Sequence, residues 1–572
     1  MITTETINRI LGITESFQMH DVLMKALFCI EERNRIFDEF LQEEQDLSYD
    51  WFTNYFQEEQ SNRKSFMQDY TPACLCRTLS GLVSNDSDIL DECAGIGGLT
   101  ISEWNRNPDR TFYLEELSDN SVALLLFNLS IRGVNAYVRH GDVLTNRFKK
   151  VYRLERNGRF SDITETTDKE YEVGTVISNP PYSLKFEAAE AFKEDIRYSH
   201  YGMPPKAKAD YAFIMHALYR LKDNGQALFI LPHGVLFRGQ KEGEIRRRLL
   251  EDGMIEAVIG LPDKLFLNTQ IPVCIIVLKK GRAGRDVLVI DASKEFIKGG
   301  KQNDMSEEQI QKLLDTYRNR QEKERYSRLV SINEIEQNEY NLNIPRYVDT
   351  FEKPAEIDLR IEVEKLEQLE NEIHDSEMKL GSMLKTLTGD AEYEAERDRL
   401  VNHLETKEIH GLSEQTRQID NYIAQQRSAL SNQVQVRLYD VAEFERSRKG
   451  VIYPEGSILI QVSATKGQLV FMDKQGEVDS KYGVITPKGV ESKYLYYILE
   501  MVLPGFLARY QTGLNINPDI FKHLEFAVHT DREVQHTVIA ILDTLQEQIG
   551  ICEQGITGWK DIKTFHLDGM FP

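Results

Sequence analysis

Short apolar runs alternate with segments of helical pattern between residues 89 and 300. The runs include Thr111–Leu114, Ala227–Leu231 and Val273–Leu278. Near-continuous apolar runs are typical of strands that are buried on both faces, and helices between such strands are the pattern of βαβ units. The alternation therefore predicts an α/β fold, with a doubly wound and mostly parallel sheet within residues 66–350.

Patterns in the rest of the chain predict four further parts. Residues 1–65 carry apolar positions at helical spacing, so we expect a small N-terminal helical region. Leucine or isoleucine recurs every seven residues from Leu359 to Leu387, which predicts a coiled-coil arm over residues 351–430. Residues 431–530 should form a small domain with a β-rich stretch, Val451–Tyr497. Residues 531–572 should hold a second heptad helix, which we expect to pack antiparallel against the first.

Composition indicates several globular domains with an uneven charge. The chain has 572 residues, of which 41% are hydrophobic and 28% charged. Its formal net charge of −23 argues against a protein that coats nucleic acid through its net charge. Residues 351–430 hold 10 Lys and Arg against 19 Asp and Glu, whereas residues 431–530 hold 11 of each. Any contact with nucleic acid should therefore involve a limited surface and weaken with salt.

Apolar segments and cysteines argue against membrane and metal-binding roles. The longest apolar stretch is Ile271–Leu278, far shorter than the roughly 20 residues that span a bilayer, and the N-terminus lacks the apolar core of a signal peptide. We therefore expect a cytoplasmic protein with no membrane partner. Six cysteines are scattered along the chain, and Cys74 and Cys76 have no second Cys or His pair at zinc spacing, so no metal site is expected.

Three loops at predicted strand ends carry residues suited to a nucleoside. Asp91 opens a glycine-rich turn that leads into a helical segment, and glycines let a ligand approach the backbone closely. The glycines are Gly95, Gly97 and Gly98. Glu116 ends the next strand, where an acid can accept hydrogen bonds from ribose hydroxyls. Asp142 ends a third strand and can accept a hydrogen bond from an adenine amino group.

The segment Asn179-Pro180-Pro181-Tyr182 is the most discriminating motif. Its prolines make the loop rigid and remove N–H donors, so the Asn179 side-chain oxygen and the Pro180 carbonyl can both accept hydrogen bonds from one planar amino group. These acceptors draw the amino nitrogen toward tetrahedral geometry and expose its lone pair to an electrophilic methyl group. Tyr182 offers a face for stacking a base that has left its helix. A surface turn is the alternative interpretation, which the three preceding loops disfavour.

With these motifs in this order, the chain resembles the S-adenosylmethionine-dependent amino-methyltransferases, and specifically the methylation subunits of type I restriction-modification systems. The resemblance runs from Phe66 to about Thr350. The glycine loop is similar to the family's Asp-Pro-Ala-Cys-Gly-Ser-Gly-Gly, but departs from it at Glu92, Cys93, Ala94 and Ile96. Four segments resemble the subfamily's own signature: Ala209–Phe213, Leu231–Gly239, Ile259–Asp263 and Asn341–Tyr347.

The resemblance implies a Rossmann-like methyltransferase sheet, S-adenosylmethionine as cofactor, and methylation of a flipped adenine at its N6 nitrogen. It makes Asn179, Pro180, Pro181 and Tyr182 the catalytic set. It makes Tyr70, Thr71, Pro72, Asp91, Gly95, Gly97, Gly98, Glu116 and Asp142 the cofactor-binding set. The order of the motifs is similar to the family arrangement called gamma.

The C-terminal part resembles half of a specificity subunit of the same systems. This resemblance implies that the β-rich part reads double-stranded DNA and that the helix from Val534 docks methylation subunits. Candidate DNA contacts are Arg238, Arg446, Arg448 and Lys466. We expect either a homodimer in which each copy reads one half-site, or a complex with specificity and possibly restriction subunits.

Two other functions fit part of the pattern. The Asn-Pro-Pro-Tyr motif also suits an N5-glutamine protein methyltransferase, but such enzymes are small and lack heptad helices. A non-catalytic DNA-binding or assembly module is disfavoured by the presence of Asp91, Glu116, Asp142 and Asn179. The motif by itself leaves adenine and cytosine open as targets, whereas Tyr182 and the type I resemblance favour adenine.

Overall fold

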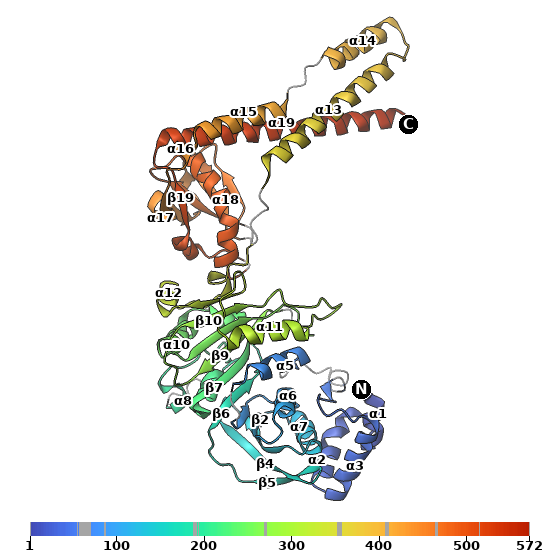
Figure 1. Cartoon of the computed structure of the whole chain (residues 1–572), viewed down its shortest axis with the longest axis vertical. Coiled ribbons are helices and arrows are strands. Elements are labelled where there is room, and N and C mark those ends of the chain that lie inside the picture. The colour runs from blue at the N-terminus through green and yellow to red at the C-terminus, as the bar shows by residue number, and fades with distance from the viewer. Residues whose placement is uncertain are drawn as a thin grey trace. The chain divides into compact units, whose positions relative to one another are not determined.

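The computed structural model divides into two compact units, Met1–Thr350 and Phe351–Pro572 (Figure 1). The structure describes residues 2–53, 55, 70–84, 87–182, 184–186, 192, 194–267, 271–351, 357–406, 411–463, 467–513 and 515–570. None of the helices in these ranges is long and apolar enough to cross a bilayer.

The first unit is built on one large sheet. Within the described residues its strand order is β11-β10-β8-β9-β7-β6-β1-β2-β3-β4-β5. The strands are β1 (Ile89–Asp91), β2 (Thr111–Glu116), β3 (Asn135–Asp142), β4 (Arg147–Asn157), β5 (Phe160–Thr166), β6 (Val173–Ser178), β7 (Leu221–Pro232), β8 (Ile255–Gly260), β9 (Val273–Lys279), β10 (Val287–Asp291) and β11 (Ser327–Val330). The central strands β3, β2, β1, β6 and β7 are parallel, as predicted. Towards both ends the sheet becomes mixed, because β4, β5, β9 and β11 pair antiparallel with their neighbours.

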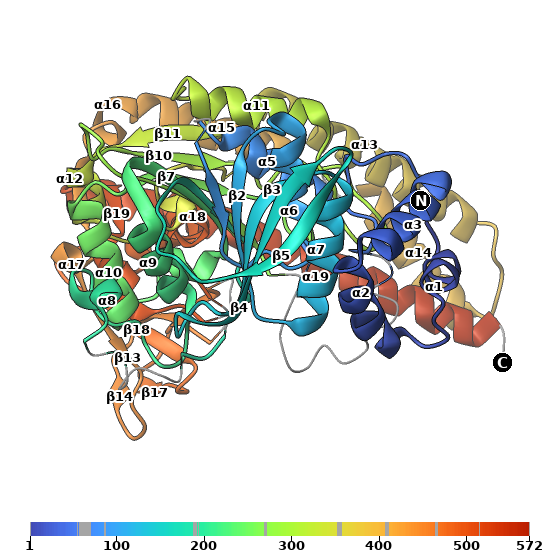
Figure 2. The same ribbon diagram turned by 90° about the horizontal axis from the view of Figure 1, so that it is seen from below.

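Helices cover both faces of this sheet (Figure 2). One face packs against α5 (Ala73–Leu82), α6 (Gly98–Arg106), α7 (Asp119–Ile131) and α11 (Glu307–Arg318). The other face packs against α8 (Ile196–Ser199), α9 (Asp210–Arg220), α10 (Gln240–Glu251) and α12 (Ile332–Gln337). The described part of the unit also contains three short 3₁₀ turns: η1 (Ser16–Gln18), η2 (His233–Leu236) and η3 (Ile344–Arg346). Because side chains alternate along a strand, Ile89 enters the first core and Leu90 enters the second. The α/β prediction is confirmed.

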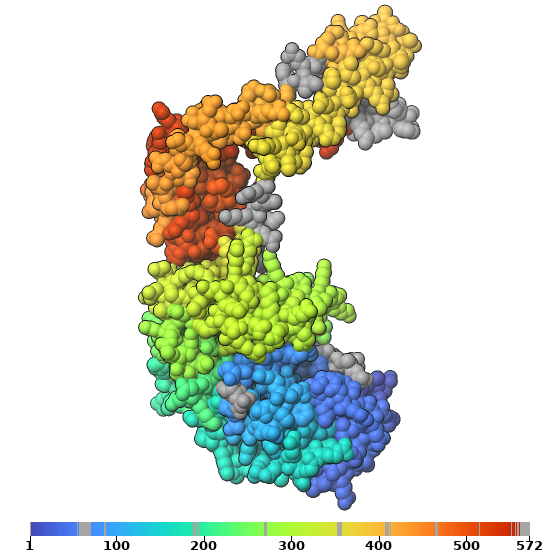
Figure 3. All heavy atoms as spheres, in the orientation of Figure 1, coloured from blue at the N-terminus to red at the C-terminus, as the bar shows by residue number. Residues whose placement is uncertain are grey.

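The N-terminal helices share the first of these cores. They are α1 (Thr4–Leu11), α2 (Met19–Leu27) and α3 (Ile30–Glu43), coloured dark blue in Figure 3 against the lighter blue of the sheet region. The rings of Phe37, Phe40 and Phe52 lie 4.9, 4.9 and 5.0 Å from the ring of Phe127 on α7, all near edge-to-face geometry. This region therefore buries its apolar face against the sheet domain.

Helices make up much of the second unit. They are α13 (Leu359–Leu384), α14 (Ala391–Thr406), α15 (Leu412–Gln425), α16 (Arg427–Leu430) and α19 (Arg532–Met570). The predicted first heptad helix is α13, whose main partners are α14 and α15. Lys385 pairs with Glu405 at 2.6 Å, and the Ser413 hydroxyl donates to Glu370 at 2.7 Å. Ile373 of the heptad pattern stays 57% exposed. The antiparallel packing of the two heptad helices stays a prediction.

A β-rich body lies between these helices in the sequence. Its strands are β12 (Val434–Arg437), β13 (Ala442–Arg446), β14 (Ile452–Tyr453), β15 (Ile458–Gln461), β16 (Leu469–Phe471), β17 (Gly476–Glu477), β18 (Tyr482–Pro487) and β19 (Glu525–Val528), with α17 (Leu438–Val441), α18 (Ser492–Tyr510) and η4 (Pro518–His523). The sequence interpretation extended the β-rich stretch to Tyr497, but α18 begins at Ser492. The helix buries Tyr494, Leu495, Ile498 and Leu499, a helical spacing that outweighs the strand preference of its tyrosines.

The turn before α6 requires glycine at one position but not at the next. Gly97 has a φ of +96°, and a Cβ there would lie 2.9 Å from Leu125 Cδ1. A Cβ at Gly98 would meet Cys76 Sγ at 3.7 Å, an ordinary contact. We expect Gly97→Ala to lower the free energy of unfolding by about 1–3 kcal/mol and the matched Gly98→Ala to change it by less than about 1 kcal/mol. Denaturant unfolding of both variants measures this difference, and equal losses would contradict it.

Candidate active site

A cavity of about 320 Å³ lies at the carboxyl ends of the central strands. Ten residues predicted to act at the site line it: Tyr70, Thr71, Gly95, Gly98, Glu116, Asp142, Asn179, Pro180, Pro181 and Tyr182. Pro72 lines an adjoining pocket together with Tyr70 and Thr71. Asp91 and Gly97 are not among the residues that line either space. The strand-end loops thus meet at one edge of the sheet, as the sequence predicts.

The glycine loop is tied to the end of β2 by the Glu116 carboxylate. Its Oε2 accepts the Gly95 N–H at 2.8 Å, and its Oε1 accepts the Ser118 N–H at 2.7 Å. Gly95 reaches this position with a φ of +55°, in the left-handed region that glycine adopts freely. Glu116 also lines the cavity, so its carboxylate lies where a ligand would bind.

Asp142 is held by the backbone of its own loop. Its Oδ1 accepts the Leu144 N–H at 2.9 Å, which sets the direction of the carboxylate. The cavity wall continues from Asp142 through Val143 and Leu144, so an acceptor lies next to apolar side chains. That pairing suits a flat heterocycle with an amino group at its edge.

The amide of Asn179 is oriented from both sides. Its Nδ2 donates to the Thr71 hydroxyl at 2.9 Å, and its Oδ1 accepts the Tyr182 hydroxyl at 2.7 Å. The Tyr182 ring packs edge-on against Phe266 at 5.9 Å. Oδ1 therefore has a fixed direction and keeps one lone pair for a substrate amino group. Stacking of a base on Tyr182 stays a prediction.

Asp91 lies behind the cavity wall and fastens α6 to β1. The side chain is buried, with 1% of the residue exposed, and its Oδ2 accepts the Thr100 hydroxyl at 2.9 Å. Burial raises the pKa of Asp91 to about 7, although the hydrogen bond from Thr100 opposes this. Its assignment to the cofactor-binding set stays a prediction.

Several cavity residues were missed from the sequence. Glu92 and Cys93 line the cavity, at two positions where the glycine loop departs from the family pattern. Burial, reinforced by the charge of Glu115, raises the pKa of Glu92 well above its usual range. Phe213 also lines the cavity and closes the signature segment Ala209–Phe213, which is the signal that was available for it.

The four candidate DNA contacts have different surroundings. Arg238 is 26% exposed at its side chain and pairs with Asp210 and Glu242. Arg446 ends β13 and is exposed, and Arg448 is exposed with an ion pair to Glu445 at 2.7 Å. Lys466 lies outside the described residues. A DNA role for each of the four stays a prediction.

Two parts of the chain match models of known protein families. Residues 45–356, more than half of the chain, match the model of the N-6 DNA methylase family. The chain belongs to this family. Residues 427–557 of this N-6 DNA methylase match the model of the type I restriction modification DNA specificity domain. The matched regions contain the cavity and the β-rich body, respectively.

Named relatives of this N-6 DNA methylase agree with the family match. The MjaVII type I restriction enzyme methylase subunit of Methanocaldococcus jannaschii is 32% identical over 60% of this chain and 60% of its own length. The MpnII methylase subunit of Mycoplasma pneumoniae is 29% identical over 58% of this chain and 61% of its own. A crystal structure of a type I methyltransferase subunit from Streptococcus thermophilus is 39% identical, covers 49% of this chain and 59% of that one, and has a TM-score of 0.45. The chain thus spans about 60% of the length of the curated relatives it matches.

The buried Asp91 should make stability depend on pH. Its pKa is about 7 in the folded protein and about 3.9 in an unfolded chain, so the folded state binds more protons between these values. The contribution of Asp91 to the free energy of unfolding should therefore fall as pH rises from about 4 to about 7. Asp91→Asn removes this penalty, and its melting temperature relative to wild type should increase between pH 5 and pH 8. Thermal unfolding at both pH values tests this; a difference that does not change with pH would show that Asp91 is ionised throughout.

Proposed function

We propose that this chain transfers a methyl group from S-adenosylmethionine to the N6 amino group of an adenine flipped out of double-stranded DNA at a specific site. One observation carries the proposal. The oriented Asn179 amide, the Gly95 turn and the carboxylates of Glu116 and Asp142 line a single cavity. An acceptor for a target amino group thus lies beside acceptors for a nucleoside.

The residues around the cavity suit S-adenosylmethionine. Glu116 offers carboxylate lone pairs to ribose hydroxyls, and Asp142 offers them to the adenine amino group. Val143, Leu144 and Phe213 provide apolar walls for the adenine ring. The volume of about 320 Å³ lies within the range of about 300–1,000 Å³ that is usual for small-molecule sites.

The chain's own residues would prepare the target amino group. S-adenosylmethionine, when bound, supplies a methyl group on a positively charged sulfur. The Asn179 Oδ1 and the Pro180 carbonyl would each accept a hydrogen bond from one of the two amino N–H groups. These bonds would draw the nitrogen toward tetrahedral geometry and direct its lone pair at the methyl carbon. With that methyl donor bound, the nitrogen–carbon bond would form as the carbon–sulfur bond broke, and the methylated amino group would then release one proton to solvent. No general base is needed before attack, because the amino group itself is the nucleophile.

The C-terminal unit supports DNA as the substrate. The match of residues 427–557 to a specificity domain favours recognition of a DNA sequence by the β-rich body, with Arg446 and Arg448 as candidate base readers and Lys466 as a candidate phosphate contact. Arg238 is a further candidate near the entry of the flipped base. A DNA substrate agrees with the cytoplasmic location that the sequence predicts.

The family match bears on the alternatives as well. An N-6 DNA methylase with a specificity domain is a less suitable catalyst for N5-glutamine methylation of protein, and N6 chemistry favours adenine over cytosine. The oriented Asn179 amide disfavours a purely non-catalytic module.

Removing the side-chain acceptor should abolish most of the methyl transfer. We expect Asn179→Ala to reduce transfer to DNA by about 10²-fold or more, because one of the two groups that prepare the amino nitrogen is lost. The measurement is incubation with S-adenosylmethionine and genomic DNA, followed by modified-base sequencing. The expected wild-type product is N6-methyladenine at one defined site.

A matched control is Asn338→Ala, because the Asn338 amide donates only to the nearby Glu334 carbonyl at 3.1 Å on α12. This variant should methylate like wild type. Absence of any mark from wild type, or an unchanged mark from Asn179→Ala, would rule out the proposed mechanism.

The proposed half-size specificity module predicts a two-fold assembly. We propose a homodimer in which each copy reads one half-site; a complex with separate specificity and restriction subunits is the alternative. Light scattering of the protein with DNA should give two chains per complex, and the methylated site should be palindromic. A complex of one chain on a non-symmetric site would contradict the dimer.

A further inference from the structure

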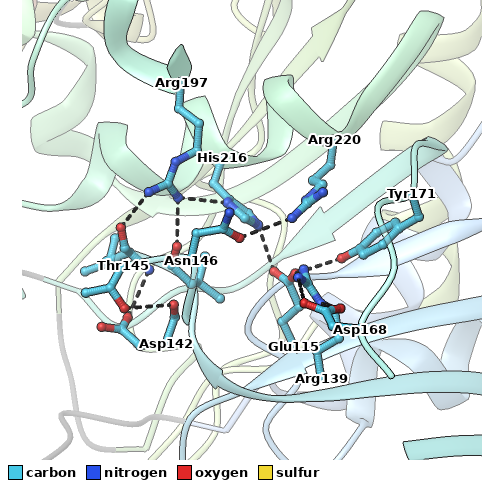
Figure 4. Close-up of polar contacts among 12 residues, drawn as sticks. Glu115, Arg139, Asp142, Thr145, Asn146, Asp168, Tyr171, Arg197, His216 and Arg220 are labelled. Carbon is cyan, nitrogen blue, oxygen red and sulfur yellow. Dashed lines mark hydrogen bonds and ion pairs between the residues drawn. The ribbon is translucent and has the colours of Figure 1, made fainter. Parts of the chain in front are cut away.

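A network of buried polar contacts lies beside the cavity floor, centred on Glu115 (Figure 4). Glu115 precedes Glu116 at the end of β2 and is fully buried. Its Oε1 accepts from Arg139 at 2.5 Å and from the Tyr171 hydroxyl at 2.7 Å, and its Oε2 accepts from His216 at 2.8 Å. Burial alone would raise the pKa of Glu115, but the hydrogen bond from His216 and the charge of Arg139 outweigh burial and hold the pKa below its usual range. Glu115 is therefore a buried anion.

His216, on α9, connects Glu115 to a second buried side chain, Arg197, through hydrogen bonds at both of its ring nitrogens. Arg197 Nη1 lies 3.0 Å from His216 Nδ1. Because an arginine N–H can only donate, Nδ1 must be the acceptor, so Nε2 carries the proton and donates to Glu115. Burial lowers the pKa of His216, which agrees with this neutral form. The imidazole is thus held in one tautomer by its two neighbours.

Arg197 uses all five of its N–H groups. Besides His216, its Nη1 donates to the Val143 carbonyl at 2.8 Å, and its Nη2 donates to the Leu144 carbonyl at 2.8 Å. The remaining N–H groups of Nε and Nη2 bind the Asp195 carboxylate at 3.0 and 2.7 Å. The side chain is 2% exposed. A buried guanidinium whose five N–H groups all donate hydrogen bonds has little freedom to move.

The two carbonyls that Arg197 binds belong to the loop that follows Asp142. Leu144 contributes its carbonyl to Arg197 and its N–H to the Asp142 carboxylate. Further along the same loop, the Asn146 side chain accepts from Arg220 Nη2 at 3.1 Å, and Arg220 is also buried. Buried arginines therefore hold the loop at two points, as Figure 4 shows.

We propose that Arg197 and His216 are positioning residues that set the direction of the Asp142 carboxylate toward the adenine amino group of the cofactor. The inference rests on the proposed use of S-adenosylmethionine. In this arrangement Glu115 and Arg197 together fix the tautomer of His216, and His216 in turn orients Arg197. Arg197 then holds the carbonyls of Val143 and Leu144. The Leu144 N–H donates to the Asp142 carboxylate and so sets its direction. The ribose end and the adenine end of the site are thereby linked through the protein interior.

The test compares two replacements of His216. His216→Gln can offer an oxygen to Arg197 and an N–H to Glu115, whereas His216→Phe keeps a planar ring with neither group. The ligands are S-adenosylhomocysteine and its analogue with purine in place of adenine, which lacks the amino group. Titration calorimetry gives the ratio of the two affinities for each variant.

Wild type should prefer S-adenosylhomocysteine over the purine analogue by about tenfold or more, the usual scale of one hydrogen bond to a charged group. His216→Phe should lose most of this preference, and His216→Gln should restore it in part. The matched control is His200→Phe, because His200 pairs with Asp252 on the surface and should leave the ratio unchanged. The ratio of the two affinities reports only on the adenine end of the ligand. A general loss of stability would weaken the binding of both ligands and would leave this ratio unchanged.

Arg197→Lys provides a second route if His216→Phe does not fold. It keeps the charge but has three donors, too few for both carbonyls, His216 and Asp195 together, so the preference should again fall. If wild type binds and discriminates the ligands but both His216→Phe and Arg197→Lys discriminate equally well, the positioning role is wrong and the cofactor proposal stands. If wild type binds neither ligand, both proposals are overturned.

Discussion

Parallel pairing of β1 between β2 and β6 is the constraint on which the site depends. Leu90 of β1 lies opposite Tyr113 of β2 and Val176 of β6. In such a register the chain leaves all three strands at the same edge, and β3 follows in parallel. Groups that are far apart in sequence, such as Gly95 and Asn179, therefore line one cavity.

Two neighbouring acids at the end of β2, Glu115 and Glu116, make contacts on opposite faces of the sheet. Successive side chains of a strand point to opposite sides, so Glu116 bonds to the glycine loop before α6 while Glu115 bonds to His216 on α9. Glu116 lines the cavity, whereas Glu115 forms an ion pair with the buried Arg139. Removing a single partner from such a pair leaves an uncompensated buried charge, which costs about 3–5 kcal/mol. The cavity wall is therefore stiff where it must present acceptors.

The sequence predicted the parts of the fold that depend on local pattern. Apolar runs located the central strands, and the ends of these strands with the segments that follow them hold eight of the ten predicted residues that line the cavity; the other two, Tyr70 and Thr71, precede β1. It misjudged Ser492–Tyr497, where tyrosines of strand preference lie on a helix that buries one apolar face. It did not predict that Thr71 orients Asn179, or that His216 meets Glu115, because these partners lie 108 and 101 residues apart in the chain. Tertiary contacts of that range leave no periodic trace in a single sequence.

The length of α19 has a mechanical consequence for the C-terminal unit. Near its start, Asp543 accepts from Lys493 at 2.8 Å and from the Tyr497 hydroxyl at 2.6 Å, which fastens the helix to α18. The helix continues to Met570 and has 39 residues in all. At about 1.5 Å per residue it is about 58 Å long, so a tilt of about 5° at the fastened end moves the other end by several ångströms. A small change in the contact between α18 and α19 would thus produce a larger displacement at the C-terminal end of α19.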